Sequence, residues 1–197
     1  MVDLIENGGV AILPTETVYG LAGRADQSET IDKIYNIKGR DFNKPLALCV
    51  NTIAMANHYG FMTGLAEELA KAFWPGPLSL IVKARNIELD PRLYGRNSRG
   101  EKTISMRCPQ ADWTASMKEL PLALTSANPS GEPAPINIQQ ATAYIGAKVD
   151  AIYNGSPCEI GVASTILLIE GQNGTILREG SLTAKDLTAY NIYRDKK

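Results

Sequence analysis

Five cationic side chains lie in predicted loops or at the ends of predicted strands, where they could hold a phosphate group. They are Lys38, Arg40, Lys44, Arg107 and Arg178. Lysine and arginine donate charge-assisted hydrogen bonds to phosphate oxygens, so these residues would form an anion clamp if the fold gathers them at one sheet edge. The alternative interpretation is that they are solvated charges, or, for Lys38, a cation that the dipole favours at a helix C-terminus.

Hydroxyl groups gather in two other segments. Residues 15–20 read TETVYG, and residues 125–128 read TSAN directly after an apolar run. Hydroxyl and amide groups on turns can satisfy the polar atoms of a ligand without adding charge. Each short motif is weak evidence by itself, because Ser, Thr and Asn are ordinary turn residues.

Several common catalytic chemistries lack their residues in this sequence. The single histidine, His58, lies in a predicted helix beside no nucleophile motif, which disfavours a serine or cysteine hydrolase. The cysteines, Cys49, Cys108 and Cys158, form no CxxC pair and predict neither a zinc site nor a disulfide framework. Neither a Walker loop, GxxxxGK(S/T), nor the dinucleotide fingerprint GxGxxG occurs. A nucleotide would therefore be held by cations and by backbone N–H groups in turns.

The composition is that of an ordinary globular protein. The chain has 197 residues, of which 44% are hydrophobic and 21% charged, and its formal net charge is -1. This length predicts one domain spanning residues 1–197. The charge balance disfavours a protein that is basic all over, so a polyanion would have to bind a local patch. No segment approaches the roughly 18 apolar residues that span a bilayer, and the acidic start is unlike a secretory signal, so we expect a cytoplasmic protein without membrane contact.

Apolar runs bounded by turn residues predict a mixed α/β sheet with flanking helices. Strands are expected within residues 8–14, 45–50, 78–84, 102–109, 120–126, 151–154, 163–169 and 174–180, the last two as an antiparallel pair. Helices are expected from Asp26 or Ser28 to Gly39, after Thr52, from Thr63 to the WPGP motif, over 139–146 and over 181–190. Ligand sites in open α/β sheets lie at the carboxyl ends of strands, which is where TSAN falls.

Seven motifs in order resemble those of the YrdC-type threonylcarbamoyl-AMP synthases, also called the TsaC family. They are LPTETVYGL, KGRDFNKPL, FWPGPLSLIV, ISMRCP, LTSANPSGEPAP, ASTIL and ILREG, and together they cover nearly the whole chain. The resemblance implies a YrdC/RibB-like fold, a twisted mixed sheet with flanking helices and a concave basic site. It also implies a nucleotidyltransferase that makes L-threonylcarbamoyladenylate and pyrophosphate from L-threonine, bicarbonate or CO2, and ATP. Mg2+ would accompany the triphosphate, with no metal ligand from the protein.

The resemblance assigns roles to particular residues. Catalytic roles fall to Lys38, Arg40, Ser126 and Asn128. Contacts with ATP fall to Arg40, Lys44, Thr103, Ser126, Ala134 and Arg178. Contacts with threonine fall to Thr17, Tyr19, Cys49, Arg107, Leu124 and Ser164. Two positions depart from the family pattern, because Asp41 replaces a usual proline and Cys49 replaces a common histidine, and the second change leaves the amino-acid specificity open.

The resemblance also implies partners. In the family, a TsaD-type transferase complex takes up the product and modifies adenosine 37 of tRNA. Two alternatives stay open at this point. The chain could be a non-catalytic module that binds double-stranded RNA with the same basic face, in which case its affinity should fall steeply with salt. It could also be a paralogue that adenylates another carbamoyl substrate, as in the carbamoyl-adenylating domains of hydrogenase maturation proteins.

Overall fold

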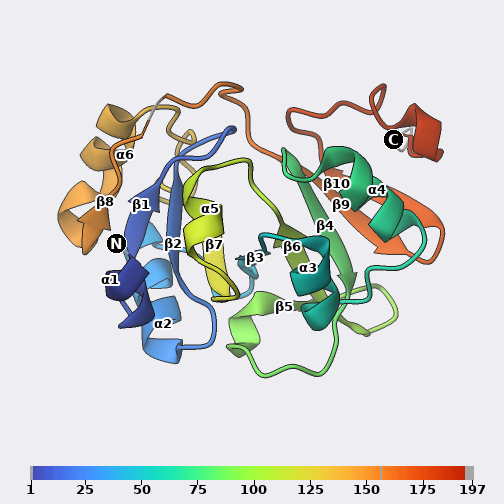
Figure 1. The fold of residues 1–197 in the computed structure, drawn as a ribbon, viewed down its shortest axis with the longest axis horizontal. Coiled ribbons are helices and arrows are strands. Elements are labelled where there is room, and N and C mark those ends of the chain that lie inside the picture. The colour runs from blue at the N-terminus through green and yellow to red at the C-terminus, as the bar shows by residue number, and fades with distance from the viewer. Residues whose placement is uncertain (1, 156, 194–197) are drawn as a thin grey trace.

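A single mixed sheet organises the chain in the computed structural model, which describes residues 2–155 and 157–193. Its strands are β1 (Ala11–Leu13), β2 (Gly20–Arg24), β3 (Ala47–Cys49), β4 (Leu78–Lys83), β5 (Tyr94–Arg96), β6 (Lys102–Arg107), β7 (Leu122–Ser126), β8 (Ala151–Ile152), β9 (Thr165–Glu170) and β10 (Asn173–Arg178). The order across the sheet is β10-β9-β4-β6-β3-β7-β2-β1-β8, with β5 paired to β6 outside this path. Strands from both ends of the sequence therefore share one sheet (Figure 1).

The sheet is mixed in direction, as the sequence predicted. Three pairs are parallel, namely β1 with β8, β3 with β6, and β4 with β9. The other pairs are antiparallel, including the expected β9–β10 hairpin, which carries a register shift between Ile176 and Arg178. This shift lies immediately before the arginine that ends β10, and such irregularities commonly re-aim a side chain near a site.

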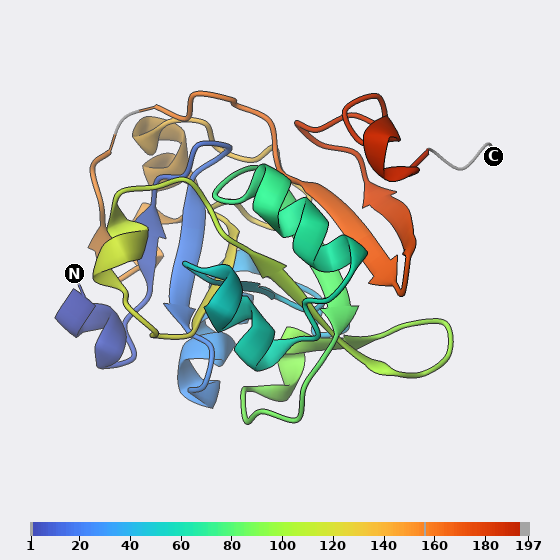
Figure 2. The same cartoon turned by 45° about the vertical axis from the view of Figure 1, so that its right-hand side comes forward.

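The helices lie against the sheet at separate places. They are α1 (Val2–Glu6), α2 (Ser28–Lys38), α3 (Ile53–Tyr59), α4 (Leu65–Phe73), α5 (Trp113–Ser116) and α6 (Ile138–Ile145). Helix α2 packs on β2, and α4 packs on β4. Figure 2 shows α3 and α4 side by side in front of the strands in the right-hand half of the sheet.

Apolar side chains alternate between the two faces of the sheet and build a core on each. Ile12 and Leu48 belong to the larger cluster, which also contains the buried apolar residues of α2 and α4. Their neighbours Leu13 and Cys49 belong to a smaller cluster with Trp113. Because successive side chains of a strand point to opposite faces, this partition fixes which way each strand residue is directed.

Helix boundaries differ from the prediction at two starts. The N-cap of α2 is Gln27, without a side-chain capping bond, so neither Asp26 nor Ser28 caps it. Helix α4 begins after Gly64, whose φ of 56° leads the chain into the helix, so Thr63 is not the cap. Thr52 caps α3 as expected, since its hydroxyl accepts a hydrogen bond from the Met55 N–H at 3.0 Å.

The helix predicted over 181–190 is wrong. The N–H groups of Leu187 and Thr188 bond to carbonyl oxygens three residues back, so the chain winds as tight turns with a 3-10 helix at Thr188–Tyr190. Asn191, with φ of 56°, then reverses the chain. This allows the fully buried Ile192 to pack on Gly174 of β10, a tertiary contact that overrides the helical pattern.

Candidate active site

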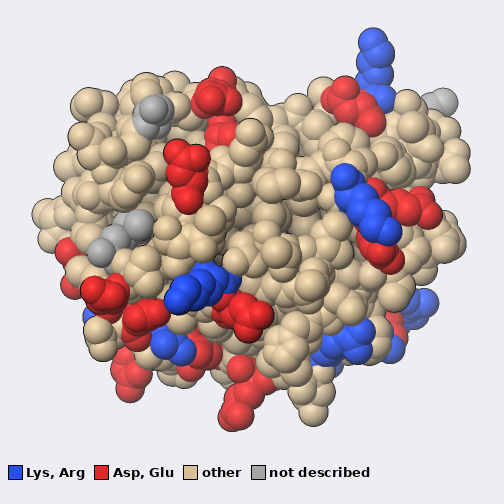
Figure 3. Space-filling view, in the orientation of Figure 1, with Lys and Arg blue, Asp and Glu red and all other residues tan. Residues whose placement is uncertain are grey.

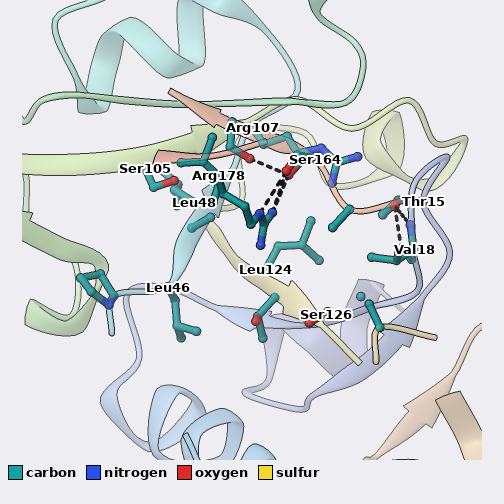
Figure 4. A pocket seen from close by; sticks show the side chains of 18 of the residues that line it. Thr15, Val18, Leu46, Leu48, Ser105, Arg107, Leu124, Ser126, Ser164 and Arg178 are labelled. Carbon is teal, nitrogen blue, oxygen red and sulfur yellow. Dashed lines mark hydrogen bonds between the residues drawn. The ribbon is translucent and has the colours of Figure 1, made fainter. Parts of the chain in front are cut away.

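A cavity of about 430 Å³ lies along one face of the sheet and is bordered by loops. Residues from eight strands, β2–β7, β9 and β10, line it. They are Gly20, Ala47, Leu48, Ser79, Ile81, Gly95, Thr103, Ser105, Arg107, Leu124, Thr125, Ser126, Ile166 and Arg178. Its remaining wall comes from loops and includes Thr15, Arg40, Asn128, Ala134 and Ser164. Figure 4 shows these side chains converging from all sides, with Leu46, Leu48 and Leu124 supplying an apolar part of the wall.

Three arginines from distant parts of the sequence reach this cavity, namely Arg40, Arg107 and Arg178. Burial lowers the pKa of Arg178, and the positive charges of Arg107 and Arg40 lower it further. Like charges held this close in a partly buried cavity favour an anion as ligand. On the outer face in Figure 3, by contrast, lysine and arginine side chains are interspersed with aspartate and glutamate.

Arg40 is directed by the end of α2 and by its own loop. Helix α2 ends at Gly39, which is left-handed with φ of 57°, a conformation that glycine adopts without strain. The Arg40 guanidinium then donates to the carbonyl oxygens of Lys44 and Pro45, each at 2.9 Å. One edge of the guanidinium is thereby fixed to the loop, and the outer donors remain for a ligand.

Arg107 is the end of β6 and is held by a buried acid. Its Nη2 donates to Glu16 Oε1 and Thr17 Oγ1, both at 2.8 Å, and its Nε donates to the Gly76 carbonyl at 3.2 Å. Glu16 also accepts from the Gln110 N–H at 3.2 Å. Because Glu16 neutralises Arg107 from behind, the guanidinium is fixed in direction, and its Nη1 has no protein partner among the described residues.

Arg178, the last residue of β10, lines the cavity and is held by Ser164. Its Nη2 donates to the Ser164 carbonyl at 2.7 Å and to the Ser164 hydroxyl at 3.3 Å (Figure 4). Ser164 Oγ lies 3.0 Å from Ser79 Oγ, so β4, the loop before β9, and β10 contribute to one hydroxyl-rich corner. Little of this corner is exposed, since Ser79 and Ser164 are buried.

Lys38 lies behind the cavity wall, beneath the TSAN turn. Its Nζ donates to the carbonyl oxygens of Ser126 and Asn128, the latter at 2.6 Å, and lies 3.5 Å from Asn128 Oδ1. The turn bonds back through the Ser130 N–H, which donates to the Lys38 carbonyl at 2.8 Å. Burial, followed by the positive charge of Arg40, lowers the pKa of Lys38 to about 8. Lys38 therefore supports the turn that carries Ser126 and Asn128.

The TETVYG segment forms a second compact turn. Thr15 Oγ1 accepts from the N–H groups of Thr17 and Val18, both at 3.2 Å, and donates to the Val18 carbonyl at 2.7 Å. Tyr19 is fully buried, and its hydroxyl donates to the Gly155 carbonyl at 2.8 Å. Burial raises the pKa of Tyr19, so its hydroxyl stays protonated at neutral pH.

The structure brings most of the predicted site residues to one cavity. On its wall are Arg40, Thr103, Arg107, Leu124, Ser126, Asn128, Ala134, Ser164 and Arg178. Lys38 and Thr17 lie one layer behind and bond to residues on the wall. The cavity wall does not include Lys44, Tyr19 or Cys49; Lys44 is exposed, and Cys49 packs in the smaller core cluster.

Sequence reasoning did not assign Thr15, Glu16, Ser79 or Ser105 to the site. Thr15 and Glu16 stand in the PTET motif, and Ser79 follows PGPL, so a signal was present for these three. Ser105 lies between Thr103 and Arg107 on β6, and its place on the same face follows once the strand is known.

Within residues 2–155 and 157–193, no three His, Cys, Asp or Glu side chains are grouped to hold a metal ion. None of the described helices is long and apolar enough to cross a membrane.

Comparisons by sequence identify relatives along almost the whole chain. A sequence model of the Sua5/YciO/YrdC family, described as "Telomere recombination", matches residues 3–180. The threonylcarbamoyl-AMP synthase of Bacillus subtilis is 33% identical over 193 residues, covering 94% of this chain and 54% of that protein. A Methanocaldococcus jannaschii protein, provisionally named for the same activity, is 32% identical over 183 residues, covering 93% of this chain and 85% of its own.

Comparisons by structure agree. P. abyssi Sua5 in complex with L-threonine matches with a TM-score of 0.86 at 28% identity, over 96% of this chain and 55% of that one. E. coli YciO matches with a TM-score of 0.81 at 23% identity, over 94% of this chain and 89% of that one, which supports the fold. The chain spans about half the length of the B. subtilis and P. abyssi proteins. The predicted fold class is confirmed, and the chain belongs to the Sua5/YciO/YrdC family.

Proposed function

We propose that the protein is an L-threonylcarbamoyladenylate synthase, a nucleotidyltransferase that joins L-threonine, bicarbonate or CO2, and ATP with release of pyrophosphate. The observation that carries this proposal is the convergence of Arg40, Arg107 and Arg178 on one hydroxyl-lined cavity. Relatives named for this activity, and a similar structure that holds L-threonine, support it.

The length of β6 separates two ends of the cavity. Thr103, Ser105 and Arg107 alternate along the strand and all line the cavity, so Thr103 and Arg107 lie roughly 13 Å apart at about 3.3 Å per residue. This span suits an amino acid joined through a carbamate to a nucleotide. We assign the Arg107 end to threonine and the Thr103 end to ATP.

At the threonine end, Arg107 would receive the carboxylate. Its Nη1 donors are available on the cavity side, while Glu16 and Thr17 hold the guanidinium from behind. Ser164 and the backbone near Leu124 would complete the pocket, and Tyr19 and Cys49 would support it from the buried side.

Arg40 would hold the phosphates from the nucleotide end, and Arg178, which bonds to Ser164 of the threonine pocket, would reach them where the two substrates meet. Lys44, exposed on the same loop as Arg40, would add a second charge from outside the wall. Thr103, Ser126 and Ala134 would contact the nucleotide, with Asn128 and Lys38 fixing the turn. Mg2+ would enter on the triphosphate and keep mostly water ligands, since such ions rarely need a protein cage.

The chemistry asks for positioning rather than for a protein nucleophile. The threonine nitrogen bonds to the carbon of CO2, or of bicarbonate with loss of water, and gives N-carboxythreonine. A carbamate oxygen then bonds to the α-phosphorus of ATP while the bond to pyrophosphate breaks. Holding these reactants in line can contribute roughly 7 to 11 kcal/mol, and arginines facing the phosphate oxygens stabilise the charge that develops there. A TsaD-type complex would take up the product for transfer to adenosine 37 of tRNA, in the cytoplasm.

The decisive experiment follows pyrophosphate release with ATP, Mg2+, bicarbonate and threonine. We expect release only when all are present, together with threonylcarbamoyl-AMP detected by mass spectrometry. Pyrophosphate release without threonine would refute the proposal, and equal release with carbamoyl phosphate in place of threonine and bicarbonate would favour a paralogue with another carbamoyl substrate.

Replacing Arg40 tests whether ATP binds in this cavity. Arg40→Ala should weaken ATP binding by about 1.5 to 3 kcal/mol, the scale of a lost charge-assisted hydrogen bond. The matched control is Arg85→Ala, because Arg85 bonds to Asn57 on the outside of the molecule and does not line the cavity. An unchanged nucleotide titration for Arg40→Ala would remove Arg40 from the site.

A further inference from the structure

Tyr35 lies beneath the loop that carries Arg40. It is the buried residue one turn before the end of α2, and its hydroxyl donates to the Lys44 carbonyl oxygen at 2.9 Å. The same oxygen accepts from Arg40 Nε, also at 2.9 Å. Tyr35 and Arg40 therefore meet at one backbone atom, and any movement of that carbonyl moves the guanidinium.

The Tyr35 ring stacks on Phe42, and Arg92 lies beside both rings, with its guanidinium carbon 5.9 Å from the Phe42 ring centroid. The two stacked rings have centroids 4.9 Å apart and an interplanar angle of 15°. The Arg92 guanidinium carbon lies 5.5 Å from the Tyr35 ring centroid. Arg92 is fixed in turn by Asp90, which accepts from its Nε and Nη2 at 2.8 Å each, and by Asp32.

The loop also holds its own shape. The Asp41 carboxylate accepts from the Asn43 N–H at 2.9 Å, and the Asp41 carbonyl accepts from the Lys44 N–H at 3.0 Å. At the far end, the Leu46 N–H donates to the Arg92 carbonyl at 3.1 Å. Asp41, which departs from the family pattern, thus forms a turn that presents the Lys44 carbonyl to Tyr35.

Electrostatics agree with this contact. Burial raises the pKa of Tyr35, while the charge of Arg40 and a hydrogen bond to Arg40 act in the opposite direction. The hydroxyl is therefore protonated at neutral pH and serves as a donor. Phe42, in contrast, is 57% exposed, so the ring stack forms the outer surface of the loop.

We propose that Tyr35 is a positioning residue for Arg40, and that through Arg40 it sets the affinity for the phosphates of ATP without affecting threonine. This inference rests on the proposed function of the same site. Arg40 has one edge bound to loop carbonyls, so its outer donors point where the loop directs them. Removing the Tyr35 hydroxyl takes one of the two hydrogen bonds from the Lys44 carbonyl, so the Arg40 guanidinium that bonds to the same carbonyl is held less firmly.

The test is Tyr35→Phe, which keeps the ring, its burial and the stack on Phe42. We expect the dissociation constant for Mg-ATP, measured by calorimetric titration, to rise about fivefold, the scale of one neutral hydrogen bond. The KM for threonine should stay at the wild-type value. Tyr94→Phe is the matched control, because the Tyr94 hydroxyl also donates to a backbone carbonyl, that of Ile87.

A double variant separates positioning from general stability. If Tyr35 acts through Arg40, adding Tyr35→Phe to Arg40→Ala should weaken ATP binding no further, whereas independent effects would add. Phe42→Ala, which removes only the exposed ring of the stack, should shift ATP affinity in the same direction as Tyr35→Phe.

Outcomes against the inference are distinct from failure of the proposed function. Wild-type protein that binds no ATP would refute the proposed function, and the role of Tyr35 with it. Wild-type protein that binds ATP, with a Tyr35→Phe variant of equal affinity, would overturn the positioning role alone. Additive losses with Arg40→Ala, or equal losses for ATP and threonine, would also overturn it.

Discussion

Replacing Lys38 with methionine is expected to remove a pH-dependent term from the folding free energy. Lys38 is only 3% exposed, and the partners of its ammonium group are the carbonyl oxygens of Ser126 and Asn128 and the Asn128 amide oxygen. No carboxylate is among them. Burial, and after it the charge of Arg40, lowers the pKa of Lys38 from 10.5 to about 8.

The sign of the effect follows from where the proton is held. An ammonium group with a lowered pKa in the folded protein binds its proton less tightly there than in the unfolded chain. Between pH 8 and 10.5 the unfolded chain carries more of this proton, so the free energy of unfolding rises with pH over this window. At about 1.4 kcal/mol per pKa unit the ammonium costs about 3 kcal/mol at neutral pH, of which about 1 to 2 kcal/mol is regained by about pH 9.5.

Urea unfolding of wild type and Lys38→Met near pH 7 and about pH 9.5 measures this term. The wild type should gain about 1 to 2 kcal/mol relative to the variant over this interval. Burial raises the pKa of Cys49 to about 12, which lowers stability at alkaline pH, but Cys49 is present in both proteins and cancels in the difference. Lys33→Met is the reference, because it removes a half-exposed lysine from the same helix.

The reasoning would be refuted if the free energies of unfolding of wild type and Lys38→Met differed by the same amount at both pH values. It would then follow that the carbonyl oxygens around Nζ compensate the ammonium fully. A change of opposite sign would mean that an unrecognised acid faces Lys38.

Three further predictions concern other parts of the site and its frame. Glu16→Ala leaves the buried charge of Arg107 uncompensated, so urea unfolding should show a free energy of unfolding lower by about 3 kcal/mol. A variant as stable as the wild type would show that water replaces the carboxylate. In Gly180→Ala the new Cβ would lie 2.6 Å from the backbone carbon of Ser164, so the cavity wall at Ser164 must shift, and titrations should show ATP and threonine binding weakened by about tenfold. Unchanged affinities would mean that the shift does not reach the cavity. Thr52→Ala removes the cap of α3 and should lower stability by about 1 kcal/mol in urea unfolding with substrate affinities unchanged; altered affinities would link α3 to the site.

The elements that the sequence predicts well are those whose own residues carry the signal. The apolar runs of β4, β9 and the segment before TSAN are strands because their side chains are buried, and α2 ends at Gly39 because of its left-handed conformation. Strand β2, GLAGR, was not predicted. Two of its residues are glycines with no strand preference, and its extended form comes from pairing with β1 and β7 on either side.

In the candidate site, too, some positions could be predicted from the sequence and others could not. Motif order placed Arg40, Arg107 and Arg178 together, and their common cavity agrees with that prediction. Lys38 was expected beside Arg40 at the phosphates, but Gly39 turns the chain between them, so that Lys38 lies inside and Arg40 faces the cavity. Sequence spacing cannot distinguish these directions, because they depend on a single left-handed residue and on the turn that Lys38 supports.

The contribution of β10 to the cavity bears on how the protein is made. A nascent chain on the ribosome can pair β1 with β2, yet it has no complete anion site until Arg178 has left the exit tunnel and β10 has joined β9. If ATP is the ligand, as we propose, partial folds are not stabilised by it, because a ligand stabilises only the state that binds it. Adding nucleotide during synthesis or refolding should protect the finished molecule from proteolysis and leave its precursors as vulnerable as before.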